Sequence, residues 1–210
     1  MRKLLVVVAS LITLSLTGCG YNTLQSNDEQ IRSSWADVVN QFQRRADLIP
    51  NLVNTVKGFA TQEQDVLLGV TNARARVGSI QATPQLIDNP EAFAKFQAAQ
   101  QELSSTLSRL LVVSENYPQL KSDANFRALQ VTLEATETSI ALARSRYIKA
   151  VQDFNVTVRS FPSNLTAMAF GFNAKSNFTV ENEKEISNTP KVDFAPVPYK
   201  PGSTAQGVIK

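Results

Sequence analysis

The chain has 210 residues, a net charge of +3, one cysteine and no histidine. Without histidine, Ser-His-Asp triads and His-ligated zinc or iron sites are excluded, and a single cysteine excludes a disulfide within one chain. Arg2 and Lys3 belong to a predicted leader, and their loss lowers the net charge by two, to +1, so we expect no nucleic-acid partner.

Residues 1–18 have the pattern of a bacterial secretory signal, in which Arg2 and Lys3 precede the uncharged residues 4–16. This apolar segment is shorter than the roughly 20 residues that a bilayer span needs. Leu-Thr-Gly-Cys at residues 16–19 resembles a lipobox, whose cysteine is acylated and becomes the first residue of the mature protein. We therefore expect acylated Cys19 to anchor the mature chain in a lipid bilayer. The alternative is an ordinary cleaved signal or an uncleaved anchor with an incidental cysteine.

A long amphipathic helix with coiled-coil periodicity is predicted from Ile31 to Ile80, because two rows of mostly apolar residues recur at intervals of seven. The rows are Ile31, Val38, Arg45, Leu52, Phe59, Val66, Ala73, Ile80 and Trp35, Phe42, Ile49, Val56, Glu63, Val70, Val77. Pro50 lies inside this pattern, but the register is unchanged across it. We expect a kink or one-turn interruption near residues 47–50 with collinear halves; alternatively, Pro50 opens a separate helix.

Arg45 and Glu63 are the charged residues in these rows. A buried charge costs several kcal/mol unless it is paired, so each should reach solvent or meet an opposite charge. Our hypothesis is that Arg45 pairs with Glu137 or Asp153 of the third helix and fixes the register of the bundle. The alternative is that the aliphatic stem of Arg45 packs while its guanidinium stays in water.

A second helix should begin at Asn89, where an N-cap residue is followed by Pro90 and Glu91. Its apolar rows are Phe96, Leu103, Leu110, Tyr117 and Ala99, Thr106, Val113, and Tyr117-Pro118 ends it. The chain restarts at Ser122 and Asp123 after a short connection, so the second and third helices should be antiparallel neighbours.

The third helix has large residues on one row and mostly small residues on the other, which favours close helix packing. The rows are Phe126, Leu133, Ile140, Tyr147, Phe154, Phe161 and Leu129, Thr136, Ala143, Ala150, Thr157. After Phe161-Pro162, an apolar segment at residues 165–172 should fold back and cap one end of the bundle; the alternative is contact with a membrane.

The predicted fold is therefore all-α: an elongated antiparallel bundle of three long helices plus a short C-terminal helix. The bundle domain should cover residues 19–174. Residues 175–210 should form a disordered tail, because prolines recur there among polar residues while the apolar pattern ends.

The carboxylates give the chain its strongest case for catalysis. Glu134 and Glu137 share a helix face, as ligands do in helical di-iron proteins, but those proteins also supply Glu-x-x-His pairs. No aspartate-rich loop with calcium-binding spacing is present either. We predict no catalytic, cofactor or metal site, and no enzyme activity.

Several ordered motifs resemble the LemA family. They are YNTL at residues 21–24, RRADLIPNL at 44–52, VKGFA at 56–60, ENYPQLK at 115–121, NF at 125–126, LEATE at 133–137, IALAR at 140–144 and FPSN at 161–164. These motifs hold the candidate structural or interaction residues Arg44, Arg45, Asp47, Pro50, Glu137, Arg144, Phe161 and Pro162. The resemblance implies a bacterial, membrane-anchored, mostly helical domain displayed outside the cytoplasm, in a family without a settled molecular activity.

Two features depart from the family pattern. Proteins of this family often have a single uncleaved N-terminal membrane helix at the place where this chain has a lipobox. The Tyr-Asn pair that is frequent in the family is Tyr147-Ile148 here. The first changes the anchor, and the second leaves the fold intact but argues against any role ascribed to that asparagine.

Two classes of function follow from the predicted anchor and bundle. In the first, the chain is an extracytoplasmic scaffold or adaptor that binds another envelope protein. In the second, it organises the membrane or cell wall directly, with the segment around Phe170 touching lipid. We expect it on the periplasmic face of the outer or inner membrane, or on the cell surface if there is one membrane.

Overall fold

The computed structural model describes residues 2–60 and 62–178, with side chains from residue 20 onward. This part is helical and contains no strand, so the all-α prediction is confirmed. The elements are α1 (Arg2–Phe59), α2 (Gln64–Gly78), the 3₁₀ helix η1 (Pro84–Asp88), α3 (Pro90–Ser114), α4 (Pro118–Ser122), α5 (Ala124–Arg159) and α6 (Ser163–Phe170). The Cys19 side chain and residues 179–210 of the predicted tail lie outside the described residues.

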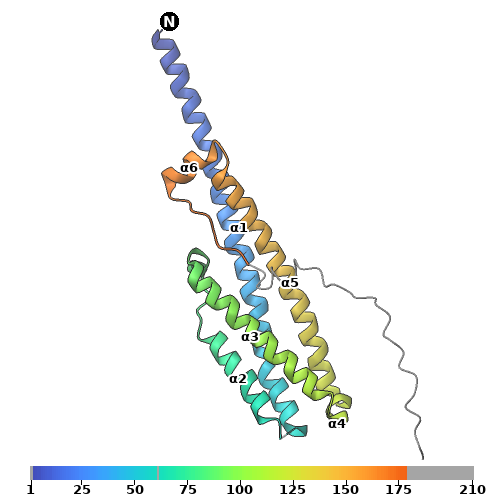
Figure 1. Ribbon diagram of the computed structural model, residues 1–210. Coiled ribbons are helices and arrows are strands. Elements are labelled where there is room, and N and C mark those ends of the chain that lie inside the picture. The colour runs from blue at the N-terminus through green and yellow to red at the C-terminus, as the bar shows by residue number, and fades with distance from the viewer. Residues whose placement is uncertain (1, 61, 179–210) are drawn as a thin grey trace, which may run out of the picture. The chain divides into compact units, whose positions relative to one another are not determined.

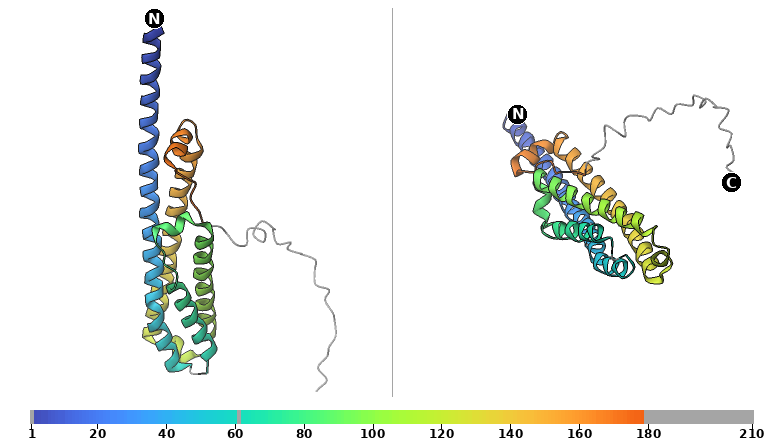
Figure 2. Two further views of the ribbon diagram at one scale, coloured as in Figure 1. Left: turned by 90° about the vertical axis from the view of Figure 1, so that its left-hand side faces the viewer. Right: turned by 60° about the horizontal axis from the view of Figure 1, so that its bottom comes forward.

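Helices α1, α2, α3 and α5 alternate in direction and lie side by side (Figures 1 and 2). The α1 helix packs mainly against α5, and α2 packs mainly against α3. The helix α6 folds back against both α1 and α5, as expected for a segment that caps one end of the bundle.

The predicted single helix over Ile31 to Ile80 is wrong, because the chain reverses after Phe59 and α2 runs back along the bundle (Figure 1). The expectation of three long helices therefore becomes four packed helices in this part of the chain. Heptad spacing misled the prediction because it reports which face of a helix is apolar and not the direction of the next helix. Leu52 and Val56 of α1 and Val70 and Ala73 of α2 lie in the same buried cluster, so the apolar faces of both helices point to one core on either side of the reversal.

Pro50 neither splits α1 nor opens a new helix, since α1 is helical from Arg2 to Phe59. Proline has no N–H, so the carbonyl of Ala46, four residues earlier, loses its helical donor. The guanidinium of Arg74 in α2 replaces it, with Nε donating to the Ala46 oxygen at 2.9 Å. A buried carbonyl is therefore satisfied by the neighbouring helix, and this bond attaches α2 to α1 at the turn that precedes Pro50.

Helices α3 and α5 begin where the sequence predicts. The Asn89 side chain accepts from the amides of Glu91 and Ala92, with Pro90 in the first turn of α3. Asp123 caps α5 by accepting from the amide of Phe126 at 2.9 Å. Each cap satisfies N–H groups that the helix itself leaves without partners.

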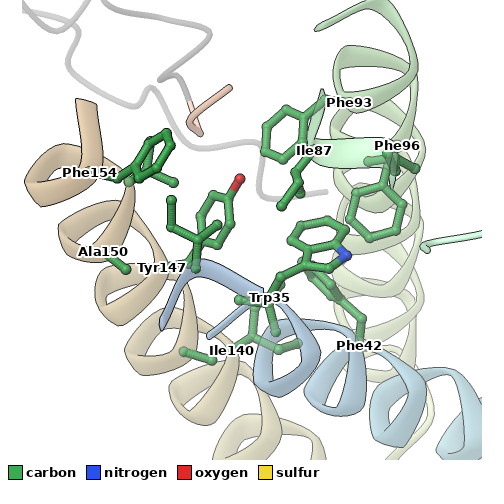
Figure 3. Close-up of a cluster of buried hydrophobic side chains, with 14 of the residues drawn as sticks. Trp35, Phe42, Ile87, Phe93, Phe96, Ile140, Tyr147, Ala150 and Phe154 are labelled. Carbon is green, nitrogen blue, oxygen red and sulfur yellow. The ribbon is translucent and has the colours of Figure 1, made fainter. Parts of the chain in front are cut away.

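The buried apolar side chains form two clusters. The aromatic core holds Trp35, Phe42, Phe93, Phe96, Tyr147 and Phe154 among its members, and Figure 3 shows these rings meeting between α1, α3 and α5. The aliphatic core is built mostly from leucine, valine and alanine of α1, α2, α3 and α5, with Phe126 as its buried aromatic residue. The single tryptophan lies in the aromatic core, where its indole N–H donates to the Ala82 carbonyl at 3.2 Å.

Residues 171–178, which we call the strap, return from α6 along the aromatic core. The predicted disordered tail includes Lys175 to Phe178, and this boundary needs correction. The Tyr147 hydroxyl donates to the Ser176 carbonyl at 2.8 Å, and Phe178 packs against Phe93 with ring centroids 5.0 Å apart. Burial raises the pKa of Tyr147, which keeps this hydroxyl protonated as a donor. The composition of this segment did not predict the strap, because the strap is held by contacts with residues that are far away in the sequence.

Candidate functional site

A layer of polar side chains separates the two cores, and Arg45 is at its centre. The Arg45 side chain is 1% exposed, although it lies one helical turn from Phe42 and from Ile49 on the buried face of α1. Its guanidinium donates to Glu137 Oε1 at 2.8 Å, Ser104 Oγ at 2.6 Å and Gln100 Oε1 at 2.6 Å. The expected ion pair with α5 is present, and the alternative of a solvated guanidinium is wrong.

The other expected acid, Asp153, binds Lys149 on its own helix instead. Glu63, the second charged residue of the first rows, is half-buried and accepts a hydrogen bond from the Tyr117 hydroxyl at 3.0 Å. This bond raises the pKa of Tyr117. Glu63 therefore binds a neutral hydroxyl group, and not the opposite charge that was one of its expected partners.

Arg144 extends the polar layer along α5. Its guanidinium lies over the Phe178 ring, 4.6 Å from the centroid, which ties the strap to the layer. Burial lowers the pKa of Arg144, and repulsion from Arg45 lowers it further while Glu137 opposes the shift. An arginine stays protonated under such a shift, so the layer holds two guanidinium groups near one carboxylate.

The remaining predicted residues do not join this layer. Arg44, Asp47 and Pro50 are exposed on the outer side of α1, where Asp47 accepts a hydrogen bond from Gln43 at 2.8 Å. Phe161 and Pro162 are exposed between α5 and α6, and their peptide bond is cis. The structure thus brings together Arg45, Glu137 and Arg144 and leaves the other five candidates apart from them.

An apolar groove of about 450 Å³ opens beside the layer. Its walls include Val39, Phe42, Ala46, Val77, Ile80 and Phe96. Arg74 is the charged residue of the described lining, and its Nε is engaged by the Ala46 carbonyl. The groove is therefore mainly apolar, and Gln43, Thr83 and Gln100 are the uncharged polar residues of its described walls.

Metal ligands are not gathered in the described part of the chain, where no three acidic or cysteine side chains are close enough to hold an ion. Within the same residues, no helix has the combined length and apolarity of a membrane span.

Comparison with known families identifies the chain. The family model described as LemA family matches residues 34–194, which covers α1 from its second half through the strap. The chain belongs to the LemA family. The polar layer and most of both cores lie within the matched residues, so they are features of the LemA region of this chain.

Three curated relatives of this chain are named magnetosome proteins. Magnetosome proteins MamQ 1 and MamQ 2 of Paramagnetospirillum magneticum are each 25% identical over 204 residues, covering 90% of this chain and 73% of the relative. Magnetosome protein MamQ of Magnetospirillum gryphiswaldense is 24% identical over the same share of both chains. Neither the family description nor these names denotes an enzyme.

Sequence reasoning missed several partners in this LemA-family chain. Gln100 and Ser104 of α3 complete the Arg45 site, and Arg74 of α2 serves the Ala46 carbonyl. Gln100 and Ser104 lie close to Leu103 of the predicted apolar row in α3. Their positions in the sequence therefore indicated that polar side chains could face Arg45. For Arg74 the signal was Pro50 itself, because a proline in a helix leaves a carbonyl that some donor must reach.

Proposed function

We propose that this LemA-family chain is a membrane-anchored, non-enzymatic helical scaffold, displayed outside the cytoplasm, that binds a helix of another envelope protein through the outer face of α5. The signal and lipobox at residues 1–19 support the anchor and the location. The family and its magnetosome relatives support a helical protein that works at a membrane.

The observation that carries the proposal is a second row of residues on α5, which we call the outer row. It consists of Val131, Ala135, Thr138, Leu142 and Ser145, which are all exposed and uncharged. Their spacing alternates between four and three residues, as in the seam of a coiled coil. Val131 is 66% exposed and Leu142 is 56% exposed, so the apolar anchors of a helix-binding seam are free in the described part of the chain.

The opposite face of α5 is fully used inside the bundle. Leu133, Ile140 and Tyr147 are buried there against α1, and Arg45 binds Glu137 across the same interface. An ion pair between Arg146 and Asp37, at 2.5 Å, and a hydrogen bond from Asn27 to Thr157, at 3.1 Å, join α5 to α1 at further levels. The outer row is therefore presented on a helix whose orientation is fixed, which reduces the entropy lost on binding.

A partner helix with apolar residues at heptad spacing fits this surface. A row of two heptads offers few large side chains, so the contact suits a regulated or weak complex more than an obligate one. The second predicted class of function, direct contact with lipid, concerns a different surface of the chain, the exposed side of α6, and is compatible with a partner helix on α5.

The test is site-specific photo-crosslinking of the full chain in its own envelope. We expect a crosslinker at Leu142 to capture a distinct protein, and the double change V131E/A135E to abolish the adduct because two carboxylates would be buried in the seam. A crosslinker at Val112, which is exposed on α3, is the matched control and should give no such adduct.

Three results would contradict the scaffold proposal. They are the absence of any adduct at Leu142, an adduct that survives V131E/A135E, and an adduct that joins two copies of this chain. Far-UV circular dichroism of the variants should match the parent protein, because every substituted position is exposed.

A further inference from the structure

Apolar side chains on α6 point away from the bundle. Thr166 and Ala167 are buried and fix the helix in place, while Leu165 and Met168, three residues apart, lie on the opposite face. Met168 is 80% exposed and Phe161, just before the helix, is 79% exposed. Leu165 and Phe170 are also exposed by more than half. Large apolar residues gathered in this way on a short segment indicate an interaction surface.

This surface lies where α1 leaves the bundle toward its N-terminus. The Tyr21 ring packs against Phe170, with centroids 4.8 Å apart. A Cβ built on Gly20 would lie 3.3 Å from Thr166 Oγ1, so α6 packs closely against α1 at this level. Figure 2 shows α6 beside α1 at the end of the bundle where α5 finishes. Tyr21 follows Cys19 by two residues, a rise of only about 3 Å along a helix.

Charge is absent from the same segment. Residues 160–174 contain no Asp, Glu, Lys or Arg, whereas Arg159 and Lys175 bound them. Lys175 is occupied by Asp28 at 3.2 Å and Asp88 at 2.5 Å, which leaves the exposed Arg159 as the cation at the edge of the apolar surface. An uncharged segment with exposed aromatic, Leu and Met side chains and a flanking arginine fits an interfacial membrane contact.

We infer that Phe161, Leu165, Met168 and Phe170 insert into the lipid interface beside the N-terminal anchor and seat the end of the bundle on the bilayer. A bilayer is the occupant because any membrane reached by residues 4–19 lies next to α6, whether Cys19 is acylated or the leader remains uncleaved. The inference rests on the anchor of the proposed function but not on its partner helix.

Seating through α6 restricts the orientation of the bundle. With the anchor and α6 both at the bilayer, the bundle cannot pivot about the anchor alone, and the opposite end, where α1 reverses into α2, projects away from lipid. The outer row on α5 is then held clear of the membrane along the upright bundle, accessible to a neighbouring protein.

The test uses the full chain, purified with its native N-terminus and reconstituted into phosphatidylcholine and phosphatidylglycerol vesicles. Phosphatidylcholine brominated on the upper acyl chain quenches only indoles that enter the bilayer. We expect M168W to add emission that brominated lipid reduces by at least about twofold, since interfacial side chains lie several ångströms below the headgroups. Trp35 is the single tryptophan of the parent, and it supplies a buried baseline.

The matched control is L68W, because Leu68 is an apolar residue that is 57% exposed but lies on α2. Its added emission should be unchanged by brominated lipid. Protein that floats with the vesicles while M168W is quenched no more than L68W would overturn the seating of α6 and leave the anchor intact. The same result would follow if a second copy of the chain, instead of lipid, covered the indole that M168W introduces. Protein that fails to float would overturn the anchor and the seating together.

Discussion

The two cores of this bundle solve the same packing problem with different side chains. In the aliphatic core four helices meet, and leucine, valine and alanine from α1, α2, α3 and α5 fill the space between them. The aromatic core contains no buried residue of α2, and there six rings and the strap close the interior instead. Where the fourth helix is missing, larger side chains and a returning segment replace it. The lesson is that one amphipathic period supports two kinds of core.

The polar layer decides whether the two cores behave as one unit. Removing Arg45 tests this most strongly, because it leaves Gln100, Ser104 and Glu137 without their common donor and opens a cavity between the cores. We expect Arg45→Ala to lower the free energy of unfolding by about 3 kcal/mol. Urea denaturation followed by both Trp35 fluorescence and far-UV circular dichroism measures the loss and shows whether the aromatic core unfolds separately.

Two further variants separate charge from packing at this site. Arg45→Met restores most of the volume and should recover the part of the loss that comes from the cavity, while Gln100, Ser104 and Glu137 still lack their donor. Glu137→Gln should cost only about 1 kcal/mol, because this side chain is 43% exposed and an amide oxygen still accepts from Arg45. A loss in Arg45→Met equal to that in Arg45→Ala would mean that the charge, and not the packing, joins the cores.

The second prediction concerns the attachment of α2. This helix contributes buried residues to the aliphatic core but not to the aromatic core. Arg74→Met keeps the side-chain stem but leaves the Ala46 carbonyl without a donor, and should cost about 2 kcal/mol. In a Pro50→Ala background the new amide at position 50 supplies that donor within α1. The same Arg74→Met change should then cost less than half as much, as measured in a double-mutant cycle. Additive effects would show that Arg74 does not compensate for the proline.

The smallest expected effect is at the strap, which packs against the aromatic core. Lys175 of the strap forms an ion pair with Asp28 of α1. Burial raises the pKa of Asp28, but hydrogen bonds and charges from Arg32 and Lys175 outweigh it and lower the pKa below its usual value of 3.8. A depressed folded-state pKa stabilises the protein above the unfolded-state value, and the stabilisation is lost as pH falls through the folded-state value. Asp28→Asn should therefore cost about 1 kcal/mol at neutral pH.

The pH profile checks this assignment. The difference in urea midpoint between Asp28→Asn and the parent, followed by Trp35 fluorescence, should be constant from neutral pH down to near 4 and shrink at lower pH. Asp153→Asn is the matched control, because its carboxylate binds Lys149 on an exposed helix face. A difference that persists unchanged in acid would rule out loss of the Asp28 charge as its cause.

The sequence alone predicted most of the helices and part of the site. The rows of α3 and α5, the cap at Asn89, the restart at Asp123 and the return of α6 follow from local rules, because helical period and capping depend on residues a few positions apart. Arg45 was also visible, since one charge in an apolar row demands a partner, and Glu137 was one of two acids placed to meet it.

Only the tertiary structure decided the reversal after Phe59, the bond from Arg74 to Ala46 and the strap over Tyr147. Each depends on groups far apart in the chain: a row of apolar residues has the same period whether the helix continues or turns back, and an orphaned carbonyl does not specify its donor. Local spacing determined which faces of this protein are buried. The direction of the chain between those faces, and the polar bonds that join them, were determined by packing in three dimensions.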